Sequence, residues 1–341
     1  MRVPKRSRRP ALQRLLGLAV SLICVAAVGV WISRQESPTW PDAAHLRWIA
    51  AALAVDSLTY TLRGWRWHHI MHLAGIAHRR ADAFALTVVG YMGNNVLPAR
   101  GGELLRIGLL GARTTARRRE VLGSIVAERL LDAAVLIGLF AVMTFAGVTG
   151  APTGKLPAAI AALGLLLAGV GLAGYLALRR RGRFEDFAAR IRPVARASKL
   201  FARPEGLLVA SVSAVIWVLQ GTTFLLIGRS LGIHLGVLEA CAVIVLASIT
   251  ALVPAAPGYV GTFDAGVAFG LHAAGVPGGA ALGFILLVRV VMFVPVTLVG
   301  LVVLLARYRG LEAFARGRRD GDAAAPAAAP TERELAGATN D

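Results

Sequence analysis

Three long apolar runs constrain the fold of this chain more than any other feature of its sequence. Residues 15–32, 156–178 and 206–228 contain no charged side chain, and about 20 apolar residues are enough for a helix to cross a bilayer. Hydrophobic residues make up 56% of the 341 residues and charged residues only 16%. Helices satisfy their own backbone hydrogen bonds in lipid. The sequence therefore predicts an all-α polytopic membrane protein.

Positively charged residues are distributed unevenly along the chain. The net charge is +18, and 28 of the 37 Lys and Arg residues lie in five segments. These segments are residues 1–14, 63–80, 113–119, 179–203 and 307–319. The loops expected at the opposite ends of the spans hold only four, which are Arg34, Arg47, Lys155 and Arg229. Because cytoplasmic loops are enriched in Lys and Arg, we expect a multi-pass protein of the cell membrane with both termini in the cytoplasm. Nucleic acid is not an expected partner.

The composition of the chain predicts three parts. We expect residues 1–13 to be a basic cytoplasmic tail and residues 14–306 to be a transmembrane domain. Residues 307–341 are expected to be a largely disordered cytoplasmic tail, because their second half is rich in Ala and Pro. About six full spans are predicted in the transmembrane domain. They are residues 15–32, 46–62, 121–147, 156–178, 206–228 and 279–306.

The apolar stretch 90–111 differs from these spans because it carries polar and helix-breaking residues. They are Asn94, Asn95, Pro98, Arg100, Gly101, Gly102, Glu103 and Arg106. An ionisable side chain at membrane depth costs roughly 2.5–3.5 kcal/mol, so such residues are usually functional. Pro98 and the two glycines break a helix, and basic clusters flank the segment on both sides. We predict that residues 83–111 form a re-entrant helical hairpin that enters from the cytoplasm and returns there.

A second hairpin is predicted at residues 237–275. Span 206–228 should end outside, whereas the last span must end inside because five arginines follow it between residues 307 and 319. A hairpin broken at residues 254–258 brings the chain back to the outer face, and two full spans satisfy the same constraint. The expected fold thus has about six full spans plus two oppositely oriented re-entrant hairpins (6–8 spans). Such a plan is an inverted repeat, which is common in secondary transporters.

Three motifs resemble those of a known family. Residues 95–106, NVLPARGGELLR, resemble the signature N-x-x-P-x-R-x-G-E-x-x-R of the lysylphosphatidylglycerol synthetase transmembrane region family, also called flippase-like. Residues 128–132, ERLLD, resemble its E-R-x-x-D element, and residues 254–264, PAAPGYVGTFD, resemble P-x-x-P-G-G-x-G-T-x-E. Tyr259 stands where the family has a second glycine, and Asp264 stands where it usually has Glu. Arg289 matches an arginine that recurs in the last span of the family.

The resemblance covers about residues 10–306 and implies a domain that moves lipids. We find no counterpart of the soluble aminoacyl-transfer domain of the two-part synthetases, so we expect no synthetic activity. The expected partners are a membrane lipid and a lipid synthase or glycosyltransferase that makes it. We expect no cofactor and no metal ion, although His68 and His72 share a helix face as metal ligands can. The identity of the lipid and the oligomeric state stay open.

The polar residues of these motifs predict a site for an anionic headgroup. Arg100, Glu103 and Arg106 are spaced by three, so on a helix they would share one side. Arginine presents a planar fork that fits phosphate oxygens. We expect Arg100 and Arg106 to bind phosphate, with Glu103 and Asp264 orienting them. The full set of expected substrate-binding residues is Asn95, Pro98, Arg100, Gly102, Glu103, Arg106, Glu128, Arg129, Asp132, Pro257, Gly258, Gly261, Thr262, Asp264 and Arg289.

Other functions compete with this interpretation. Four of the ionisable site residues are acidic and four are arginines, so they can form a lattice of ion pairs that only holds helices together. An intramembrane lipid-modifying enzyme is a further alternative, but the chain lacks the motifs G-x-G-D and H-E-x-x-H. A non-transporting scaffold for a lipid or glycan pathway is the third. Two broken helices favour a binding cavity, so we expect a transporter and not an enzyme.

Overall fold

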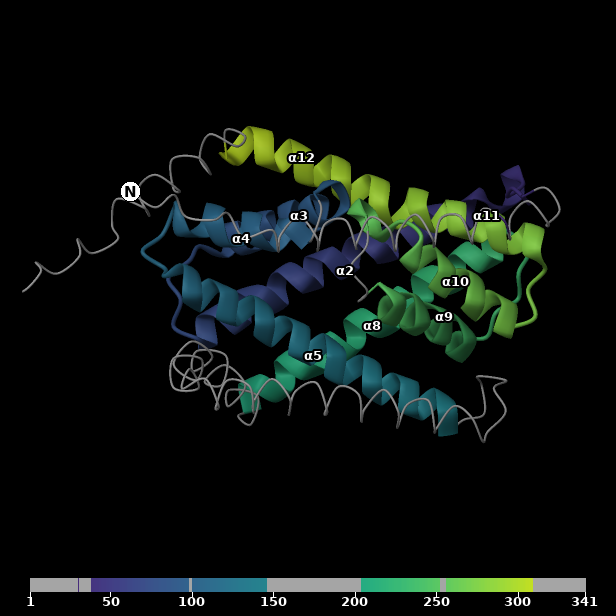
Figure 1. The fold of residues 1–341 in the computed structure, drawn as a ribbon, viewed down its shortest axis with the longest axis horizontal. Coiled ribbons are helices and arrows are strands. Elements are labelled where there is room, and N and C mark those ends of the chain that lie inside the picture. Colours follow the sequence, from purple (N-terminus) through teal and green to yellow (C-terminus); the bar gives the residue numbers. More distant parts are fainter. Residues whose placement is uncertain (1–29, 31–37, 98–99, 146–203, 252–255, 309–341) are drawn as a thin grey trace, which may run out of the picture.

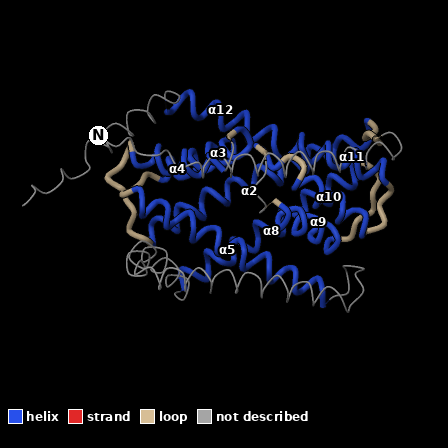
Figure 2. The backbone as a smooth tube through the Cα atoms, viewed as in Figure 1, coloured by secondary structure: helices blue, strands red, loops and turns tan. Residues whose placement is uncertain are grey.

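The computed structural model describes most of the predicted transmembrane domain. The described residues are residue 30 and residues 38–97, 100–145, 204–251 and 256–308. The predicted spans 15–32 (apart from Val30) and 156–178 lie outside them. Pro98 also lies outside them, and so do both predicted tails except Arg307 and Tyr308. Every described element is a helix, as the sequence predicted, and Figure 2 shows the described loops gathered mainly at the two ends of the bundle.

The long helices are α2 (Leu46–Leu73), α5 (Arg118–Phe145), α8 (Pro204–Ser230) and a rod of three consecutive segments. The segments of the rod are α11 (Gly278–Val288), the π-helical η4 (Arg289–Phe293) and α12 (Val294–Tyr308). A short 3-10 turn, η1 (Ala43–His45), precedes α2. Helix α2 packs along α8, and α12 packs along the first hairpin helix (Figure 1). Among the described helices, α8 and the rod are long and apolar enough to cross a membrane.

Two helical hairpins enter the bundle from opposite ends (Figure 1). The first is α3 (Arg80–Val96) followed by α4 (Gly101–Gly111), and the second is α9 (Val237–Thr250) followed by η3 (Pro257–Tyr259) and α10 (Thr262–Ala273). Their tips meet inside the bundle, where the Arg100 side chain donates to the Ala251 carbonyl at 3.3 Å. The sequence predicted this opposed arrangement. The hairpin helices are 17, 11, 14 and 12 residues long, which is at or below the lower limit of about 17 residues for a spanning helix.

Glycines allow the two helices of the first hairpin to approach closely. A methyl group at Gly102 of α4 would come within 1.8 Å of the Gly90 carbonyl oxygen of α3, and the Gly102 N–H donates to the Asn94 side chain at 3.1 Å. In the second hairpin, Gly266 of α10 lies against α9 in the same way. Small residues at such contacts are typical of helices that pack in membranes.

Helix α2 extends further than the sequence predicted. We expected a span at residues 46–62 followed by a basic cytoplasmic segment, but the helix continues to Leu73. Arg63 and Arg66 therefore lie inside the bundle, with 5% and 0% of their surface exposed. The prediction was wrong here because an arginine usually marks the end of a span, and the acids that compensate Arg66 are far away in the sequence.

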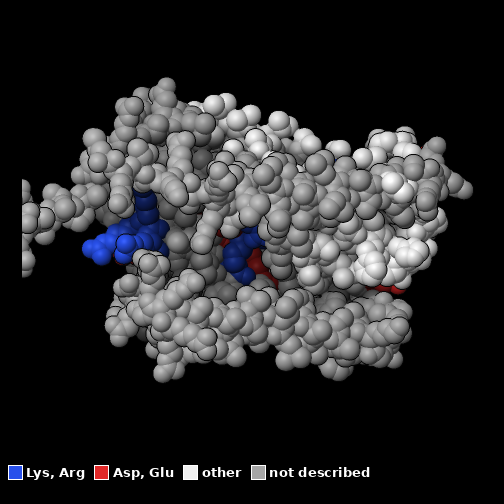
Figure 3. Space-filling view, viewed as in Figure 1, with Lys and Arg blue, Asp and Glu red and all other residues white. Residues whose placement is uncertain are grey.

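Two apolar clusters lie on either side of a polar layer. One cluster surrounds the second hairpin and includes Ala52 of α2, and the other surrounds the first hairpin and includes Trp67 of α2. Between these two positions α2 carries four buried polar residues, which are Asp56, Thr59, Arg63 and Arg66. Figure 3 shows charged side chains recessed near the middle of one face, between the two ends. The polar residues of this layer are therefore the candidates for a functional site.

Candidate functional site

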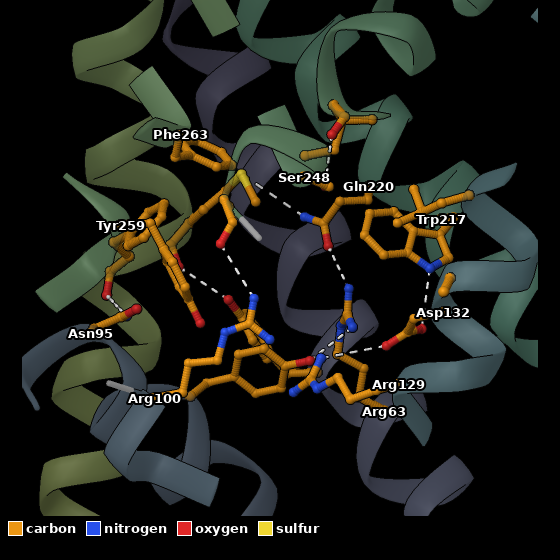
Figure 4. Close-up of a pocket in the computed structure, with 18 residues that line it drawn as sticks. Arg63, Asn95, Arg100, Arg129, Asp132, Trp217, Gln220, Ser248, Tyr259 and Phe263 are labelled. Atoms are coloured by element: carbon orange, nitrogen blue, oxygen red, sulfur yellow. Dashed lines mark hydrogen bonds and ion pairs between the residues drawn. The ribbon is translucent and has the colours of Figure 1, made fainter. Parts of the chain in front are cut away.

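A cavity of about 260 Å³ lies between the hairpin tips and the long helices α2, α5 and α8. Its polar lining residues are Arg63, Asn95, Arg100, Arg129, Asp132, Gln220 and Ser248. Its aromatic lining residues are Tyr60, Tyr91, Trp217, Tyr259, Phe263 and Phe293. Figure 4 shows that these residues come from both hairpins and from the long helices. Three arginines and one carboxylate give the described lining a net positive charge.

Arg63 of α2 is held by neutral groups. Its Nη1 donates to the Tyr91 hydroxyl at 2.8 Å, and its Nη2 donates to the Gln220 side-chain oxygen at 3.1 Å (Figure 4). The guanidinium also lies 5.3 Å and 5.5 Å from the ring centroids of Tyr91 and Trp217. Among the described residues no carboxylate forms an ion pair with Arg63. Asp56 and Asp132 interact with Arg63 only at longer range, so its guanidinium can still bind an anion in the cavity.

Arg100 lies at the tip of the first hairpin, immediately before α4. Its backbone has φ 56° and ψ 41°, which is the left-handed conformation. Its guanidinium donates to the Ala251 carbonyl and lies 5.7 Å from the ring centroid of Tyr259, both on the second hairpin. No ion pair joins Arg100 to an acid in the described part of the chain. Arg100 is thus a second cavity arginine without a bound carboxylate.

Arg129 of α5, the third cavity arginine, is paired. Its Nε donates to Glu103 at 3.1 Å, and its Nη1 lies 3.5 Å from Asp132. The second contact joins two residues that are three positions apart on the same helix. Asp132 also accepts hydrogen bonds from Arg66 at 2.6 Å and from the Trp217 indole at 3.1 Å. The single acid of the described lining is therefore engaged by three partners.

A buried ion network lies beside the cavity without lining it. The Glu128 carboxylate of α5 accepts from Arg66 of α2 at 2.9 Å and from Arg106 of α4 at 2.8 Å. Arg106 also stacks on Trp67, with its guanidinium 3.9 Å from the ring centroid. The side chains of Arg66, Arg106 and Glu128 are at most 2% exposed. This network connects three helices.

The expected common face of Arg100, Glu103 and Arg106 is not present. Arg100 precedes α4 in a non-helical conformation, so helical spacing does not apply to it. Its side chain lines the cavity, whereas Arg106 points into the buried network and Glu103 pairs with Arg129. The structure thus separates the two arginines that we expected to bind one phosphate together.

Asp264 and Arg289 stabilise the tip of the second hairpin. Asp264 accepts from the Gly261 N–H at 2.9 Å, which caps α10, and from the Arg289 Nε at 2.8 Å. Arg289 also donates to the Gly258 carbonyl. Gly258 and Gly261 have φ of 67° and 87°, which glycine adopts without steric cost. Pro257 and Thr262 begin η3 and α10, so these six predicted residues build the turn and do not line the cavity.

Of the predicted site residues, the structure brings four to the cavity, namely Asn95, Arg100, Arg129 and Asp132. Asn95 donates to the Thr297 hydroxyl of α12 at 2.9 Å. Arg63, Gln220 and most of the aromatic lining residues were not among the site residues predicted from the sequence. Gln220 could have been predicted as a site residue, because it is the one amide side chain in the apolar, uncharged run 206–228. Arg63 could not, because the sequence does not distinguish a buried arginine from one that lies at the end of a span.

A bundle of apolar helices with two opposed hairpins and an internal polar cavity defines a helical membrane protein with a buried polar site. The chain belongs to the family of the lysylphosphatidylglycerol synthase TM region, whose model matches residues 14–300. This confirms the family that the motifs predicted.

Two curated relatives are similar to the chain. A UPF0104 membrane protein of Methanothermobacter thermautotrophicus is 23% identical over 276 residues, which cover 72% of this chain and 81% of that protein. The glycosyltransferase AglD of Haloferax volcanii is 25% identical over 140 residues, which cover 41% of this chain but only 22% of AglD. The chain thus matches about a fifth of AglD and most of the UPF0104 membrane protein.

Proposed function

We propose that this protein binds the phosphate-bearing headgroup of a membrane lipid in the central cavity and carries it between the two leaflets. The observation that carries this proposal is that Arg63 and Arg100 line the cavity and form no ion pair with a described carboxylate. A largely buried charge without a counter-ion is costly in a protein interior. A phosphate in the cavity would supply that counter-charge and accept hydrogen bonds from both arginines.

The lengths of the hairpin helices support a position near the middle of the membrane. With 11 to 17 residues each, the hairpin helices are at or below the lower limit of about 17 residues for a spanning helix, so we propose that each hairpin is re-entrant and turns back near the midplane. Opposed broken helices with a site between their tips are the plan of many transporters, in which the two halves rock around the site. We propose six full spans, the cell membrane as location, and both termini in the cytoplasm.

A transport role accounts for the cavity better than catalysis does. General acid–base chemistry needs a carboxylate or similar group that is free to exchange a proton with substrate. Asp132, the single acid in the described lining, is already engaged by Arg66, Arg129 and Trp217. We therefore propose that the protein is not an enzyme. One relative bears the name glycosyltransferase, so a glycosyltransferase or lipid synthase that makes the cargo is a proposed partner.

Reconstitution with a labelled lipid tests this proposal. Purified protein in vesicles should accelerate the movement of fluorescent phosphatidylglycerol between leaflets, measured by its accessibility to an external quencher. Arg63→Lys and Arg100→Lys keep the charge but lose the two-point fork, so transport should fall at least tenfold while thermal stability is kept. Arg47→Lys is the matched control, because Arg47 is an exposed arginine on the same helix α2.

Three results would contradict the proposal. If wild-type protein does not accelerate lipid movement, the transport role is wrong. If both cavity variants transport normally, the arginines are not the headgroup site. If mass spectrometry of the vesicle lipids instead shows a modified headgroup, the protein is a lipid-modifying enzyme.

A further inference from the structure

Arg100 and Tyr259 share an unusual backbone conformation. Among the described residues they are the only non-glycine residues with positive φ, at 56° and 55°. One lies at the tip of each hairpin, and the guanidinium of Arg100 lies 5.7 Å from the ring centroid of Tyr259. A residue with a Cβ persists in this region only where its surroundings determine it, and such residues gather at functional sites. The two residues with this conformation therefore lie near each other in the lining of the cavity.

Glycine would satisfy the backbone at position 259 more easily than tyrosine does. Gly258 immediately before it has φ 67°, and glycine adopts such angles without steric cost. The conformation of the turn therefore does not explain why position 259 is a tyrosine. It is half-buried, it lines the cavity, and its ring faces Arg100.

The three cavity arginines differ in how many of their donors are free. Arg63 uses Nη1 and Nη2 for Tyr91 and Gln220, and Arg129 is paired with two carboxylates. Arg100 makes a single side-chain hydrogen bond to the described residues, from Nη2 to the Ala251 carbonyl. Its other contact is the face of the Tyr259 ring. Because a guanidinium donates in its plane and stacks through its face, the ring leaves the remaining donors of Arg100 free.

We propose that Tyr259 is a positioning residue that holds Arg100 for two-point recognition of a phosphate headgroup. This inference rests on the proposed function and extends it to a residue of the second hairpin. The ring lies on one side of the guanidinium at 5.7 Å and the Ala251 carbonyl accepts a hydrogen bond from its Nη2, so the remaining donors of Arg100 stay available to the cavity that its side chain lines. Because the two residues belong to different hairpins (Figure 4), recognition of the headgroup requires the two tips to be in contact.

Binding measurements on two Tyr259 variants test the proposal. The full chain in detergent is titrated with short-chain phosphatidylglycerol, and thermal unfolding is measured on the same preparations. Tyr259→Gly removes the ring and relaxes the backbone, so we expect binding to weaken roughly three- to tenfold. Relief of the positive φ offsets the lost packing of the ring against the core, so the unfolding temperature should change little. Tyr259→Phe keeps the ring, so it should bind within about twofold of wild type.

A double-mutant cycle with Arg100→Lys isolates the positioning role. If the ring acts through Arg100, replacing Tyr259 by Gly should cost little further affinity once Arg100 is Lys. Strictly additive losses would overturn the proposal, as would a parallel loss of stability and affinity in Tyr259→Gly, or an equal loss of affinity in Tyr259→Phe. Inorganic phosphate that binds more tightly than the lipid would show that the recognised phosphate is a free ion.

The same series separates this inference from the proposed function. If Arg100→Lys weakens binding and Tyr259→Gly does not, the headgroup site stands and the role of Tyr259 is wrong. If neither Arg63→Lys nor Arg100→Lys weakens binding of the lipid, the headgroup site itself is wrong.

Discussion

Arg66 of α2 and Glu128 of α5 form an ion pair of 2.9 Å in which both side chains are fully buried. Glu128 is shared with Arg106 of α4, and Arg66 is shared with Asp132 one turn further along α5. With Arg129, which contacts Asp132 and Glu103, three cations and three anions balance within the bundle. Removing one member of a buried pair leaves an uncompensated charge, which is far more costly than the pair itself. This network should therefore govern stability, whereas the cavity arginines Arg63 and Arg100, which lie outside it, govern binding.

We expect Glu128→Gln to reduce the free energy of unfolding by about 3–5 kcal/mol, because Arg66 and Arg106 lose their shared counter-charge. Thermal or chemical unfolding of the purified protein in detergent measures this effect. Glu205→Gln is the control, since Glu205 is exposed at the start of α8. A Glu128→Gln variant with normal stability but no transport would show that the network serves the site directly.

Gly102→Ala should destabilise the first hairpin by about 1–3 kcal/mol or more, because the added methyl group would overlap the Gly90 carbonyl of α3. Gly138→Ala on α5 is the matched control, since a methyl group there meets no atom within 4 Å. It should be neutral or slightly stabilising, as alanine favours a helix over glycine. Equal unfolding temperatures for the two variants would contradict the close packing of α3 on α4.

Asp264→Asn should weaken the tip of the second hairpin, because Arg289 loses its counter-charge at 2.7 Å. A hydrogen bond to a charged group contributes about 1.5–3 kcal/mol, and a loss of this size is expected in unfolding experiments. Hydrogen–deuterium exchange should also become faster at η3 and at the start of α10. Asp42→Asn, at a carboxylate that is 87% exposed, is the control. Unchanged exchange at η3 would show that Asp264 does not hold the turn.

The two hairpin ends should be accessible from opposite sides of the membrane. In a background without Cys24 and Cys241, we expect Ala273→Cys to react with an impermeant thiol reagent added to intact cells. Thr115→Cys, in the loop between α4 and α5, should react only after the cells are opened. This follows from the basic residues around position 115 and their cytoplasmic preference. Labelling of Thr115→Cys in intact cells would reverse the proposed orientation.

The breaks in the two hairpins could be predicted from the sequence, but the conformation of the turn at Arg100 could not. Pro98 and the glycine pair in the first motif indicated a broken helix, and the structure has two helices that pack as a hairpin there. Charge placement predicted either an opposed second hairpin or two full spans at residues 237–275, and the structure has two helices that pack on each other there. Arg106 was wrongly grouped with Arg100, because helical spacing was applied across the turn at which the helix begins. The conformation of a turn depends on contacts with residues that are distant in the sequence, and a rule of helical spacing does not take these contacts into account.

The sequence by itself determined the helical membrane class, the family and the two breaks, because hydropathy and helix-breaking residues act locally. Only the tertiary structure decided which arginine meets which acid. Arg66 and Glu128 are 62 positions apart, and Arg63 and Gln220 are 157 apart. Pairing over such distances depends on how the helices are placed beside each other. The same placement leaves Arg63 and Arg100 without a described acid partner at the cavity, and for that reason the site emerged from the fold.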